Sequence, residues 1–370
     1  MRIVVTGGGG FIGRNLRVRL SEAGFDGVTS IDRGNTTQEL TDAVAASDFI
    51  FHLAGVNRPE HPTEFDIGNR ELTASICNAL RQAGKPTPIV FTSSTQASLD
   101  NLYGQSKRAA ELELERYAEE TGARVDTVRL TNVFGKWSRP NYNSVVATFC
   151  YNLARGLPIT IADPTRPLRL VYIDDVVETL IRAVTEPGAH GGDLEVSPVY
   201  ETTVGLIAET LRSFASSRVT GMVPPAGQGL ARALFGTYAS FIDPTDFGYA
   251  LTRHADSRGV FAEMIKTQSN GQVSFFSAHP GVTRGGHYHH TKTEKFLVVA
   301  GRARFGFRQI LTGETREMVV SAEESRVVET VPGWAHDITN VGDDELIVVL
   351  WANELFDPLQ PDTVPAPVVA

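Results

Sequence analysis

A glycine-rich segment near the N-terminus limits most strongly what this chain can fold into. Thr6–Gly13 follows an apolar run, Ile3–Thr6, and precedes an amphipathic stretch, which predicts a strand, a tight turn and a helix. Gly7 permits the turn, Gly10 lets a pyrophosphate approach the backbone, and Gly13 lets the helix pack closely against the strand. An anion then binds at the helix N-terminus. Because a glycine-rich turn alone is more often only a turn, this interpretation needs a second signal.

The second signal is an acidic residue at the end of the next expected strand. Asp32 lies 19 residues after Gly13, where its carboxylate can bind the ribose of an adenosine. Arg33 follows Asp32 directly and Arg14 follows Gly13, so two guanidinium groups can also meet a 2′-phosphate. Arg14 is equally well explained as a solvated helix residue. The residues therefore predict a dinucleotide site but leave the choice between NADH and NADPH open.

The hydrophobic pattern changes in the second half of the chain, which indicates two domains. Up to about residue 214, short β-branched runs alternate with longer amphipathic stretches, as in βαβ units around a parallel sheet. Prolines and glycines interrupt the pattern at residues 224–246. After about residue 247, short runs separated by turn residues are typical of an antiparallel barrel or sandwich. A chain of 370 residues also exceeds the usual size of one core, so we expect domains at residues 1–243 and 244–370.

Composition and charge exclude several kinds of partner. The net charge is −9 and the basic residues form no cluster, which argues against nucleic acid and anionic membranes as partners. No apolar run approaches the ~20 residues of a membrane helix. The two cysteines, Cys77 and Cys150, show no pairing pattern, and the chain runs straight into Arg2–Val5 without an apolar signal segment. We therefore expect a cytoplasmic protein.

A tyrosine and a lysine lie one helical turn apart, shortly after a run of hydroxyl residues. Tyr103 and Lys107 share one face of the expected helix, and an ammonium group there can lower the pKa of the phenol. The phenol then serves as a proton donor to a substrate oxygen, or as an acceptor from it. Upstream, the strand expected at Ile89–Thr92 ends in Thr92–Thr95, at the sheet edge where open α/β folds bind ligands. A tyrosine–lysine pair alone is usually a surface pair, but together these elements predict an active site.

Over residues 1–214 the chain resembles the extended short-chain dehydrogenase/reductases. The matching segments are Thr6–Gly13, His52–Gly55, Ser93–Ser94, Tyr103–Lys107, Arg129–Gly135 and Val171–Asp175. The resemblance implies that Tyr103 is the general acid toward a ketone, that Lys107 modulates it and binds the ribose, and that Ser94 bonds the reacting oxygen. The register leaves the other residues of Thr92–Thr95 as alternatives to Ser94. Tyr103 follows Ser94 by only nine residues, which predicts a short loop over the substrate.

The same resemblance implies which residues bind the coenzyme and the sugar. The expected dinucleotide site comprises Gly7, Gly10, Phe11, Ile12, Gly13, Arg14, Asp32, Arg33, Leu53, Ala54, Tyr103 and Lys107. Extended members commonly act on nucleotide sugars. The residues placed to hold such a ligand are Arg129, Asn132, Asn141, Asn143 and Arg169. Each of these residues, taken singly, is more often structural.

A second cluster of chemically active side chains lies in the C-terminal half. His287 and His289 flank Tyr288, so in a strand both imidazoles point to the same face. Glu294 follows shortly afterwards, and His336 lies further along the chain. Three imidazoles and one carboxylate form a ligand set suited to zinc or a similar divalent transition ion. A histidine cluster alone can be a coincidental polar strand, so the spacing of the whole set decides the interpretation.

The spacing of this cluster resembles the two motifs of the cupins, a family of jelly-roll barrels. The resemblance implies that a zinc or similar ion is bound by His287, His289, Glu294 and His336. Asp256–Glu263 and Gly281–Tyr288 also resemble the metal-free cupin epimerases of 4-keto-6-deoxy nucleotide sugars, in which the histidine at the position of His287 is the base. His287 is therefore either a ligand or the proton acceptor, and His290 and Lys295 are further candidates for the base.

Both halves, in this order, resemble the bifunctional CapF-type enzymes of capsular polysaccharide synthesis over nearly the whole chain. Long local stretches carry the resemblance, namely Phe51–His61, Asn141–Val145 and His289–Val299. It implies that the substrate is UDP-2-acetamido-2,6-dideoxy-hexos-4-ulose, that the cupin epimerises carbon 3 and that the reductase then reduces the ketone at carbon 4. The product would be UDP-2-acetamido-2,6-dideoxy-L-talose, on the path to UDP-N-acetyl-L-fucosamine. The resemblance also implies NADPH as coenzyme and a homodimer.

Two other functions remain open from the sequence. An NAD-dependent nucleotide-sugar epimerase or dehydratase of the same reductase family would hold NAD tightly and act on a sugar without a ketone. A non-catalytic protein would bind NADP and sense a sugar or a metal through the cupin. Turnover of the keto sugar excludes the second alternative, and bound NAD distinguishes the first.

Overall fold

The computed structural model describes residues 1–186 and 191–369. Backbone contacts divide the chain into two units, Met1–Leu211 with Gln228–Asp243, and Arg212–Gly227 with Pro244–Ala370. The division into residues 1–243 and 244–370 remains a proposal, because Arg212–Gly227 belongs by its contacts to the second unit. Among the described residues, no helix combines the length and the hydropathy needed to cross a membrane.

The N-terminal unit is built on a parallel sheet in the order β2-β1-β3-β4-β5-β8. Its strands are β1 (Ile3–Thr6), β2 (Val28–Ile31), β3 (Phe49–His52), β4 (Ile89–Ser94), β5 (Val125–Leu130) and β8 (Gly192–Asp193). Strands β1, β3 and β4 are buried along their whole length. The strand order reverses between β1 and β3, and sheets of this kind bind ligands at such a point, beyond the carboxyl ends of the strands.

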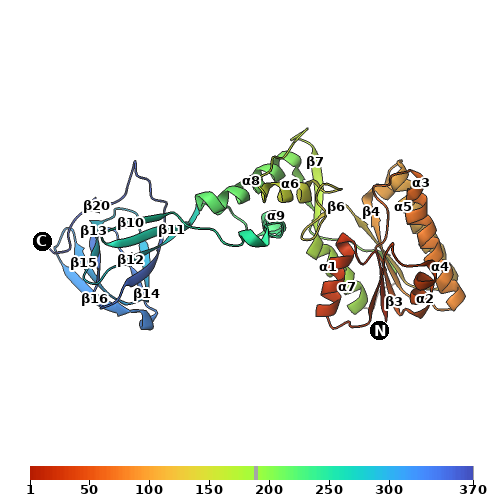
Figure 1. The fold of residues 1–370 in the computed structure, drawn as a ribbon, viewed down its shortest axis with the longest axis horizontal. Coiled ribbons are helices and arrows are strands. Elements are labelled where there is room, and N and C mark those ends of the chain that lie inside the picture. Colours follow the sequence, from red (N-terminus) through yellow and green to blue (C-terminus); the bar gives the residue numbers. More distant parts are fainter. Residues whose placement is uncertain (187–190, 370) are drawn as a thin grey trace. The chain divides into compact units, whose positions relative to one another are not determined.

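Helices cover both faces of this sheet, as Figure 1 shows. They are α1 (Phe11–Glu22) and α7 (Ile173–Thr185) on one face, and α2 (Thr37–Ala46), α4 (Leu72–Ala83) and α5 (Leu102–Thr121) on the other. Each face has its own core. In β3, Phe51 packs with Leu16 of α1, whereas the preceding Ile50 packs with Ile76 of α4, as the two-residue period of a strand requires. The expected doubly wound fold is confirmed.

A smaller sheet in the same unit was not predicted from the sequence. It consists of β6 (Asn132–Phe134), β7 (Pro167–Tyr172) and β9 (Tyr200–Thr203) in that order. Further helices of this part of the chain are α3 (Thr63–Phe65), α6 (Val145–Leu153), α8 (Val204–Thr220) and α9 (Gly229–Ala239). These strands are partly exposed and carry polar residues, so they lack the apolar runs that mark β1, β3 and β4 in the sequence.

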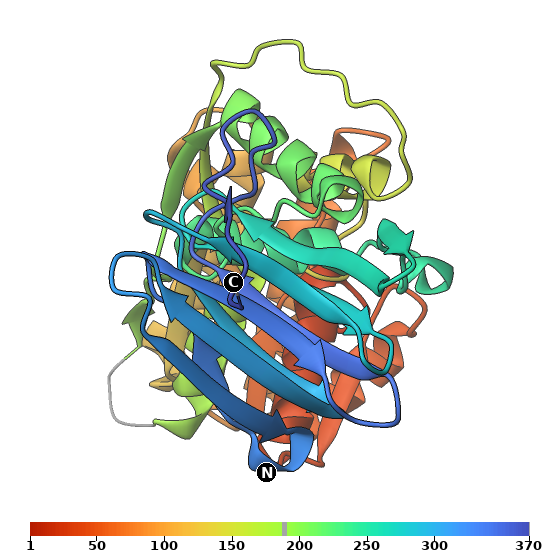
Figure 2. The ribbon, with the colours of Figure 1, turned by 90° about the vertical axis from the view of Figure 1, so that its left-hand side faces the viewer.

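The C-terminal unit consists of two antiparallel sheets, in the orders β10-β11-β12-β19-β14-β17 and β16-β15-β18-β13-β20. The first contains β10 (Arg253–Asp256), β11 (Gly259–Thr267), β12 (Gly271–Ala278), β19 (Leu346–Ala352), β14 (Glu294–Ala300) and β17 (Val327–Glu329). The second contains β16 (Thr315–Ser321), β15 (Arg302–Gln309), β18 (Trp334–Asn340), β13 (Thr283–Tyr288) and β20 (Val364–Pro365). Phe296 of the first sheet and Phe305 of the second share one core, with ring centroids 6.1 Å apart. This unit therefore has the expected jelly-roll barrel, whose strands run side by side in Figure 2.

The strand β18 carries His336 and was missed by the sequence pattern. Its residues include a histidine, an aspartate and an asparagine, which have low strand propensity and blur the alternation. In the structure β18 lies between β15 and β13 and is buried over most of its length. Its pairing therefore comes from neighbouring strands that are distant in sequence.

Candidate active site and metal centre

The glycine-rich turn lies against the loop that follows β3. Gly7 has φ +73°, and a Cβ atom there would lie 2.8 Å from the backbone nitrogen of Ala54. A Cβ atom on Gly13 would lie 2.3 Å from the carbonyl oxygen of Gly7, so the helix packs closely on the turn, as expected. Gly10 is the N-cap of α1. The turn, Leu53 and Ala54 thus meet at the reversal of strand order, where a dinucleotide is expected.

Asp32 reaches this turn, whereas the two arginines do not converge on it. The carboxylate of Asp32 accepts hydrogen bonds from the backbone N–H of Gly9 and the hydroxyl of Ser30, both at 2.8 Å. Arg14 is exposed and donates Nη2 to the carbonyl oxygen of Trp137 at 2.9 Å. Arg33 is also exposed. Binding of a ribose by Asp32, or of a 2′-phosphate by the arginines, stays a prediction.

Tyr103, Ser94 and Lys107 come together at the carboxyl end of β4. Tyr103 shares a hydrogen bond with Ser94, whose Oγ also accepts the backbone N–H of Gln96 at 3.1 Å. Lys107 is 5 % exposed and donates Nζ to the carbonyl oxygen of Thr92 at 2.8 Å. Burial lowers the pKa of Lys107 to about 8, and the charge of Glu111 opposes that shift. The structure brings the three expected catalytic side chains into one site.

The pKa of the phenol differs from the sequence-based expectation. Burial raises the pKa of Tyr103 above its ordinary value, and the hydrogen bond with Ser94 opposes this shift only in part. The ammonium of Lys107 is directed to the backbone of β4, which limits its effect on the phenol. Tyr103 is therefore protonated at neutral pH, as a proton donor must be.

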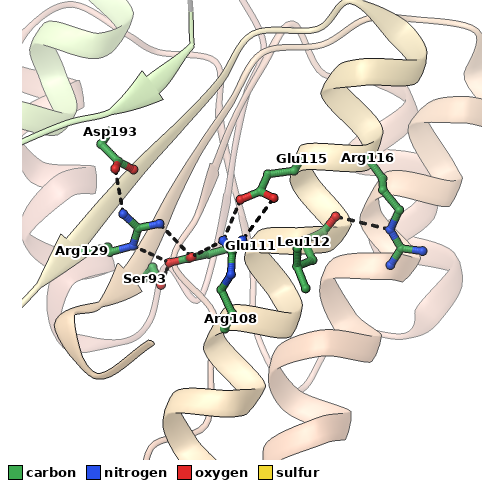
Figure 3. Close-up of polar contacts among 8 residues, drawn as sticks. All are labelled: Ser93, Arg108, Glu111, Leu112, Glu115, Arg116, Arg129 and Asp193. Atoms are coloured by element: carbon green, nitrogen blue, oxygen red, sulfur yellow. Dashed lines mark hydrogen bonds and ion pairs between the residues drawn. The ribbon is translucent and has the colours of Figure 1, made fainter. Parts of the chain in front are cut away.

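Ser93 and Arg129 belong to a separate ion network around the buried carboxylate of Glu111, drawn in Figure 3. Ser93 donates its hydroxyl to Glu111 at 2.6 Å, and Arg129 donates Nε and Nη2 to the same carboxylate at 2.9 Å each. Arg129 also pairs with Asp193 at 2.7 Å, and Arg108 donates to Glu111 at 3.0 Å. Burial alone would raise the pKa of Glu111, but the hydrogen bonds from Arg129, Ser93 and Arg108 outweigh it and lower that pKa.

This network corrects one expectation from the sequence. The guanidinium of Arg129 is engaged by two carboxylates, so it is not a free cation for a sugar diphosphate. Arg169 is exposed and lies 3.6 Å from Glu201, and its carbonyl oxygen accepts Nδ2 of Asn132 at 3.1 Å. Asn141 and Asn143, the remaining two candidates, are exposed. Their contact with a sugar stays a prediction.

His52 and Asn69, to which no role was assigned from the sequence, connect the glycine-rich turn to α5. His52 is fully buried, with Nδ1 2.7 Å from Oγ1 of Thr6 and Nε2 2.8 Å from Oγ1 of Thr73. Thr73 donates its own hydroxyl proton to the carbonyl oxygen of Asn69, so it accepts from Nε2. Burial, with the charge of Lys107, lowers the pKa of His52 to about 3. His52 is therefore neutral and structural.

Asn69 lies in a π-helical turn, Asp66–Glu71, a type of irregularity frequent at functional sites. Its side chain bonds both backbone groups of Val56 and donates Nδ2 to Oγ of Ser106 at 2.9 Å. A Cβ atom on Gly55 would lie 2.8 Å from Oδ1 of Asn69 and 3.3 Å from Nζ of Lys107. Gly55 thus leaves room for both groups. The His52–Gly55 segment was therefore the sequence signal that could have pointed to Asn69.

The four expected metal ligands converge in the barrel. One nitrogen or oxygen atom from each of His287, His289, Glu294 and His336 lies within 4.8 Å of all the others. Oε2 of Glu294 is 3.1 Å from Nε2 of His289 and 3.3 Å from Nε2 of His336. Burial raises the pKa of Glu294, but the neighbouring histidines outweigh it and lower that pKa strongly. The carboxylate of Glu294 is therefore ionised, as a metal ligand must be.

The donor set itself fits a metal. His289 directs Nδ1 to the carbonyl oxygen of Asp362, which can only accept, so Nδ1 carries a proton and Nε2 is the ring nitrogen that faces the cluster. Nε2 lies 3.1 Å from Oε2 of Glu294, so one cation can be held by both atoms. Two or three imidazole nitrogens with one carboxylate oxygen match the usual ligands of zinc. The residues present therefore fit a zinc ion or a similar divalent ion.

The structure separates the three candidate bases for the epimerisation. His287 lines the cluster, and burial, followed by the charges of His336 and His289, lowers its pKa to about 4. His290 is exposed. Lys295 is also exposed and forms an ion pair with Glu329. His290 and Lys295 lie outside the set of four converging side chains, and the identity of the base stays a prediction.

Two cationic side chains of the barrel were not assigned from the sequence. Lys292 is 8 % exposed, and its charge contributes to lowering the pKa of His287. Arg284 donates Nε to the carbonyl oxygen of Ser277 at 2.9 Å, while its buried Nη2 has no hydrogen-bond partner among the described residues. A buried guanidinium nitrogen without a partner is suited to an anionic ligand.

Comparisons with known proteins agree with this architecture. The sequence profile of the NAD dependent epimerase/dehydratase family matches residues 3–197, and that of the polysaccharide biosynthesis C-terminal domain matches residues 254–364. The chain belongs to the NAD dependent epimerase/dehydratase family and carries this second domain at its C-terminal side.

Particular relatives span the whole chain. A UDP-2-acetamido-2,6-beta-L-arabino-hexul-4-ose reductase of Pseudomonas aeruginosa is 53% identical over 363 residues, which are 98% of each protein. The crystal structure of the capsular polysaccharide assembling protein CapF of Staphylococcus aureus is 42% identical, with a TM-score of 0.92 over 99% of this chain and 100% of that one. A UDP-glucose 4-epimerase of Thermus thermophilus, in complex with NAD, shares the fold over 65% of this chain at 20% identity and a TM-score of 0.54. The expected two-part architecture of the CapF type is confirmed.

Proposed function

We propose that this protein reduces the 4-ketone of a UDP-activated 6-deoxy amino sugar with NADPH, after its barrel has epimerised carbon 3. The substrate is UDP-2-acetamido-2,6-dideoxy-hexos-4-ulose and the product UDP-2-acetamido-2,6-dideoxy-L-talose, toward UDP-N-acetyl-L-fucosamine for capsule or O-antigen. One observation carries the proposal: Tyr103 is hydrogen-bonded to Ser94, and Lys107 is held by Thr92 two residues earlier, at the carboxyl end of β4. The relative named as a hexulose reductase, similar over nearly the full length, supports the substrate class.

The reductase residues act on the oxygen at carbon 4. When bound, the reduced nicotinamide supplies the hydride. Tyr103 protonates the alkoxide that develops, and Ser94 donates a hydrogen bond to the same oxygen. The ammonium of Lys107, which the carbonyl oxygen of Thr92 holds in the free protein, binds the ribose and modulates the phenol once the coenzyme is bound. Asp32 and the glycine-rich turn hold the adenosine part of the coenzyme.

The barrel residues act on the proton at carbon 3. The neighbouring ketone acidifies this proton, and removing it leaves an enolate that can be reprotonated on the other face. When bound, the zinc ion supplies a positive charge for the enolate oxygen. His289, Glu294 and His336 hold the ion, and His287 either completes this set or accepts the proton. Epimerisation must precede reduction, because reduction removes the ketone that makes the proton acidic.

The experiment that tests this proposal is nuclear magnetic resonance of the products formed from the UDP-4-keto sugar in deuterated water. Without NADPH we expect deuterium at carbon 3 and an intact ketone. With NADPH we expect reduction at carbon 4 with inverted configuration at carbon 3. Unchanged substrate in both samples refutes the enzyme and favours the non-catalytic alternative. Tightly bound NAD with turnover of a sugar that lacks a ketone favours the oxidative alternative.

Three further expectations belong to this proposal. A cytoplasmic location follows from a pathway that uses UDP-activated sugars and NADPH. The homodimer implied by the resemblance is tested by light scattering of the purified protein, for which a mass near 40.2 kDa would indicate a monomer. Comparison of KM for NADPH and NADH tests the coenzyme preference.

A further inference from the structure

The C-terminal segment of the chain lies directly against the metal-binding cluster. β20 pairs with the end of β13, where Pro365 is opposite His287, and Ala366 donates its backbone N–H to the carbonyl oxygen of Gly286 at 2.9 Å. On its other side β13 pairs with β18. Without β20, the strand that carries His287 would lie at an unpaired edge of the sheet.

Asp362 precedes β20 and orients a metal ligand through its backbone. Nδ1 of His289 forms a hydrogen bond with the carbonyl oxygen of Asp362. Because this oxygen only accepts, Nδ1 carries a proton, and Nε2 is the ring nitrogen left for a metal. Nε2 is the atom that faces Oε2 of Glu294, at 3.1 Å. The carbonyl group of Asp362 therefore selects the ring nitrogen that is free to bind a metal.

The carboxylate of the same residue holds the loop between two metal ligands. Oδ1 of Asp362 accepts the backbone N–H of His290 at 2.8 Å, and Oδ2 accepts those of Thr291 and Lys292 at 2.7 and 2.8 Å. Oδ2 also accepts the hydroxyl of Thr291 at 3.0 Å. This loop connects His289 to Glu294, so one aspartate determines the path of the chain between them.

The segment is anchored at further points beyond Asp362. Arg308 of β15 donates Nε and Nη2 to the carbonyl oxygen of Pro367, at 2.9 and 2.7 Å. Val368 is 5 % exposed. Nζ of the buried Lys292 is 3.3 Å from Oγ1 of Thr363. The segment is thus part of the folded barrel rather than a loose tail.

We propose that the C-terminal clasp, which we define as Asp362–Val368, is a positioning element of the metal centre and that Asp362 is its positioning residue. The clasp orients His289 through a carbonyl group and spaces His289 from Glu294 through a carboxylate. This inference rests on the metal site of the proposed function. It goes beyond that function because it assigns metal affinity to residues that do not touch the metal.

Four variants of the full chain test the clasp. Asp362→Ala removes the loop contacts and keeps the backbone carbonyl, whereas termination after Pro361 removes both. Asp362→Asn keeps one acceptor oxygen and is expected to fold like the wild type. Asp357→Ala is the matched control, since Asp357 is an exposed aspartate of the same tail whose carboxylate, among the described residues, accepts only the backbone N–H of Leu359, at 2.8 Å.

The readouts are zinc affinity, measured by competition with a chromophoric chelator, and the visible absorption of the cobalt-substituted protein. We expect zinc to bind about 10–100-fold more weakly to Asp362→Ala, and at least as weakly to the truncated chain. Asp362→Asn should be intermediate, and Asp357→Ala should match the wild type. The cobalt bands of Asp362→Ala should change in position and intensity, because the ligand geometry changes. Those of Asp357→Ala should stay as in the wild type.

Each outcome decides the proposal. Wild-type zinc affinity in Asp362→Ala overturns it, as does an equal loss in Asp357→Ala. If Asp362→Ala fails to fold, Asp362→Asn decides alone, and wild-type affinity and cobalt spectrum in that variant overturn the clasp. A wild-type protein that binds no zinc overturns the clasp and the metal site together. Because these measurements use neither sugar nor coenzyme, a failed clasp leaves the proposed reaction standing, and a refuted reaction leaves the zinc result standing.

Discussion

Ser93 and Ser94 are neighbours in β4, yet their hydroxyl groups belong to different networks. Ser93 points to the face of the sheet that α5 covers and donates to the buried Glu111 of that helix, whereas Ser94 shares a hydrogen bond with Tyr103. Successive side chains of a strand point to opposite faces, which accounts for the difference. Of the hydroxyl residues that the sequence left as alternatives, Ser94 is the one that contacts Tyr103. This contact supports our proposal that Ser94 lies beside the reacting oxygen.

The first prediction contrasts these two serines. Ser94→Ala should lower kcat for ketone reduction by about 10²–10³-fold, as loss of a hydrogen-bond donor to a developing oxyanion does. Ser93→Ala should leave kcat near the wild-type value and lower the free energy of unfolding by about 1–3 kcal/mol, because Glu111 loses a buried donor. Steady-state kinetics and urea denaturation of both variants provide the comparison. Equal loss of kcat in the two would contradict the assignment.

The second prediction concerns Tyr103. Tyr103→Phe removes the proton donor with little change of shape, so NADPH oxidation with the keto sugar should fall by about 10²–10⁴-fold or more. Exchange of the carbon 3 proton with deuterium should continue, because the barrel supplies that reaction. Magnetic resonance without NADPH measures the exchange, and its disappearance in this variant would argue against separate sites.

The third prediction is a pH dependence set by Lys107. Burial lowers the pKa of Lys107 to about 8, so the ammonium form prevails below that pH and is lost above it. The value of kcat/KM for reduction should therefore decline above pH 8, since this ratio reports groups of the free enzyme. Lys107→Arg keeps its charge, and its alkaline decline should move to higher pH even if its rate is lower.

The contribution of Lys107 to protein stability should rise with pH over the same range in which kcat/KM falls. The unfolded chain holds the proton of Lys107 up to a pKa near 10.5, whereas the folded chain releases it near 8. Between these values the unfolded state binds more protons, so the contribution of Lys107 to the free energy of unfolding rises with pH. The difference between wild type and Lys107→Met in urea denaturation at pH 7 and 10 isolates this contribution. A difference that does not vary with pH would contradict the lowered pKa.

The fourth prediction concerns the metal. His336→Ala removes one of the converging nitrogens, so purified protein should lose zinc and the exchange at carbon 3 together. NADPH binding should persist, because the coenzyme site is in the other unit. His290→Ala is the matched control, since His290 is an exposed histidine of the same sequence cluster and should retain zinc. Elemental analysis decides, and wild-type zinc content in His336→Ala would refute the ligand set.

Much of this molecule was predictable because its signals are local. The strand, turn and helix around Gly7, the helix from Tyr103 to Lys107 and the paired histidines of β13 depend on backbone periods that a few neighbouring residues reveal. The strand β18 was missed because its polar residues obscure the alternation, and its pairing is decided by β13 and β15. The ion pairs of Arg129 could not be predicted either, because its partners Glu111 and Asp193 lie 18 and 64 residues away in the sequence.

The sequence by itself determined the two kinds of sheet, the glycine turn and the identity of the reactive side chains, since these depend on periodicity and residue type. Only the tertiary structure decided which of those side chains meet. It directed Ser93 and Arg129 into an ion network, left His290 and Lys295 exposed, and brought Asp362 against His289 across 73 residues. The physical reason is that hydrogen bonds and burial between segments distant in sequence follow from chain packing, which no local pattern encodes.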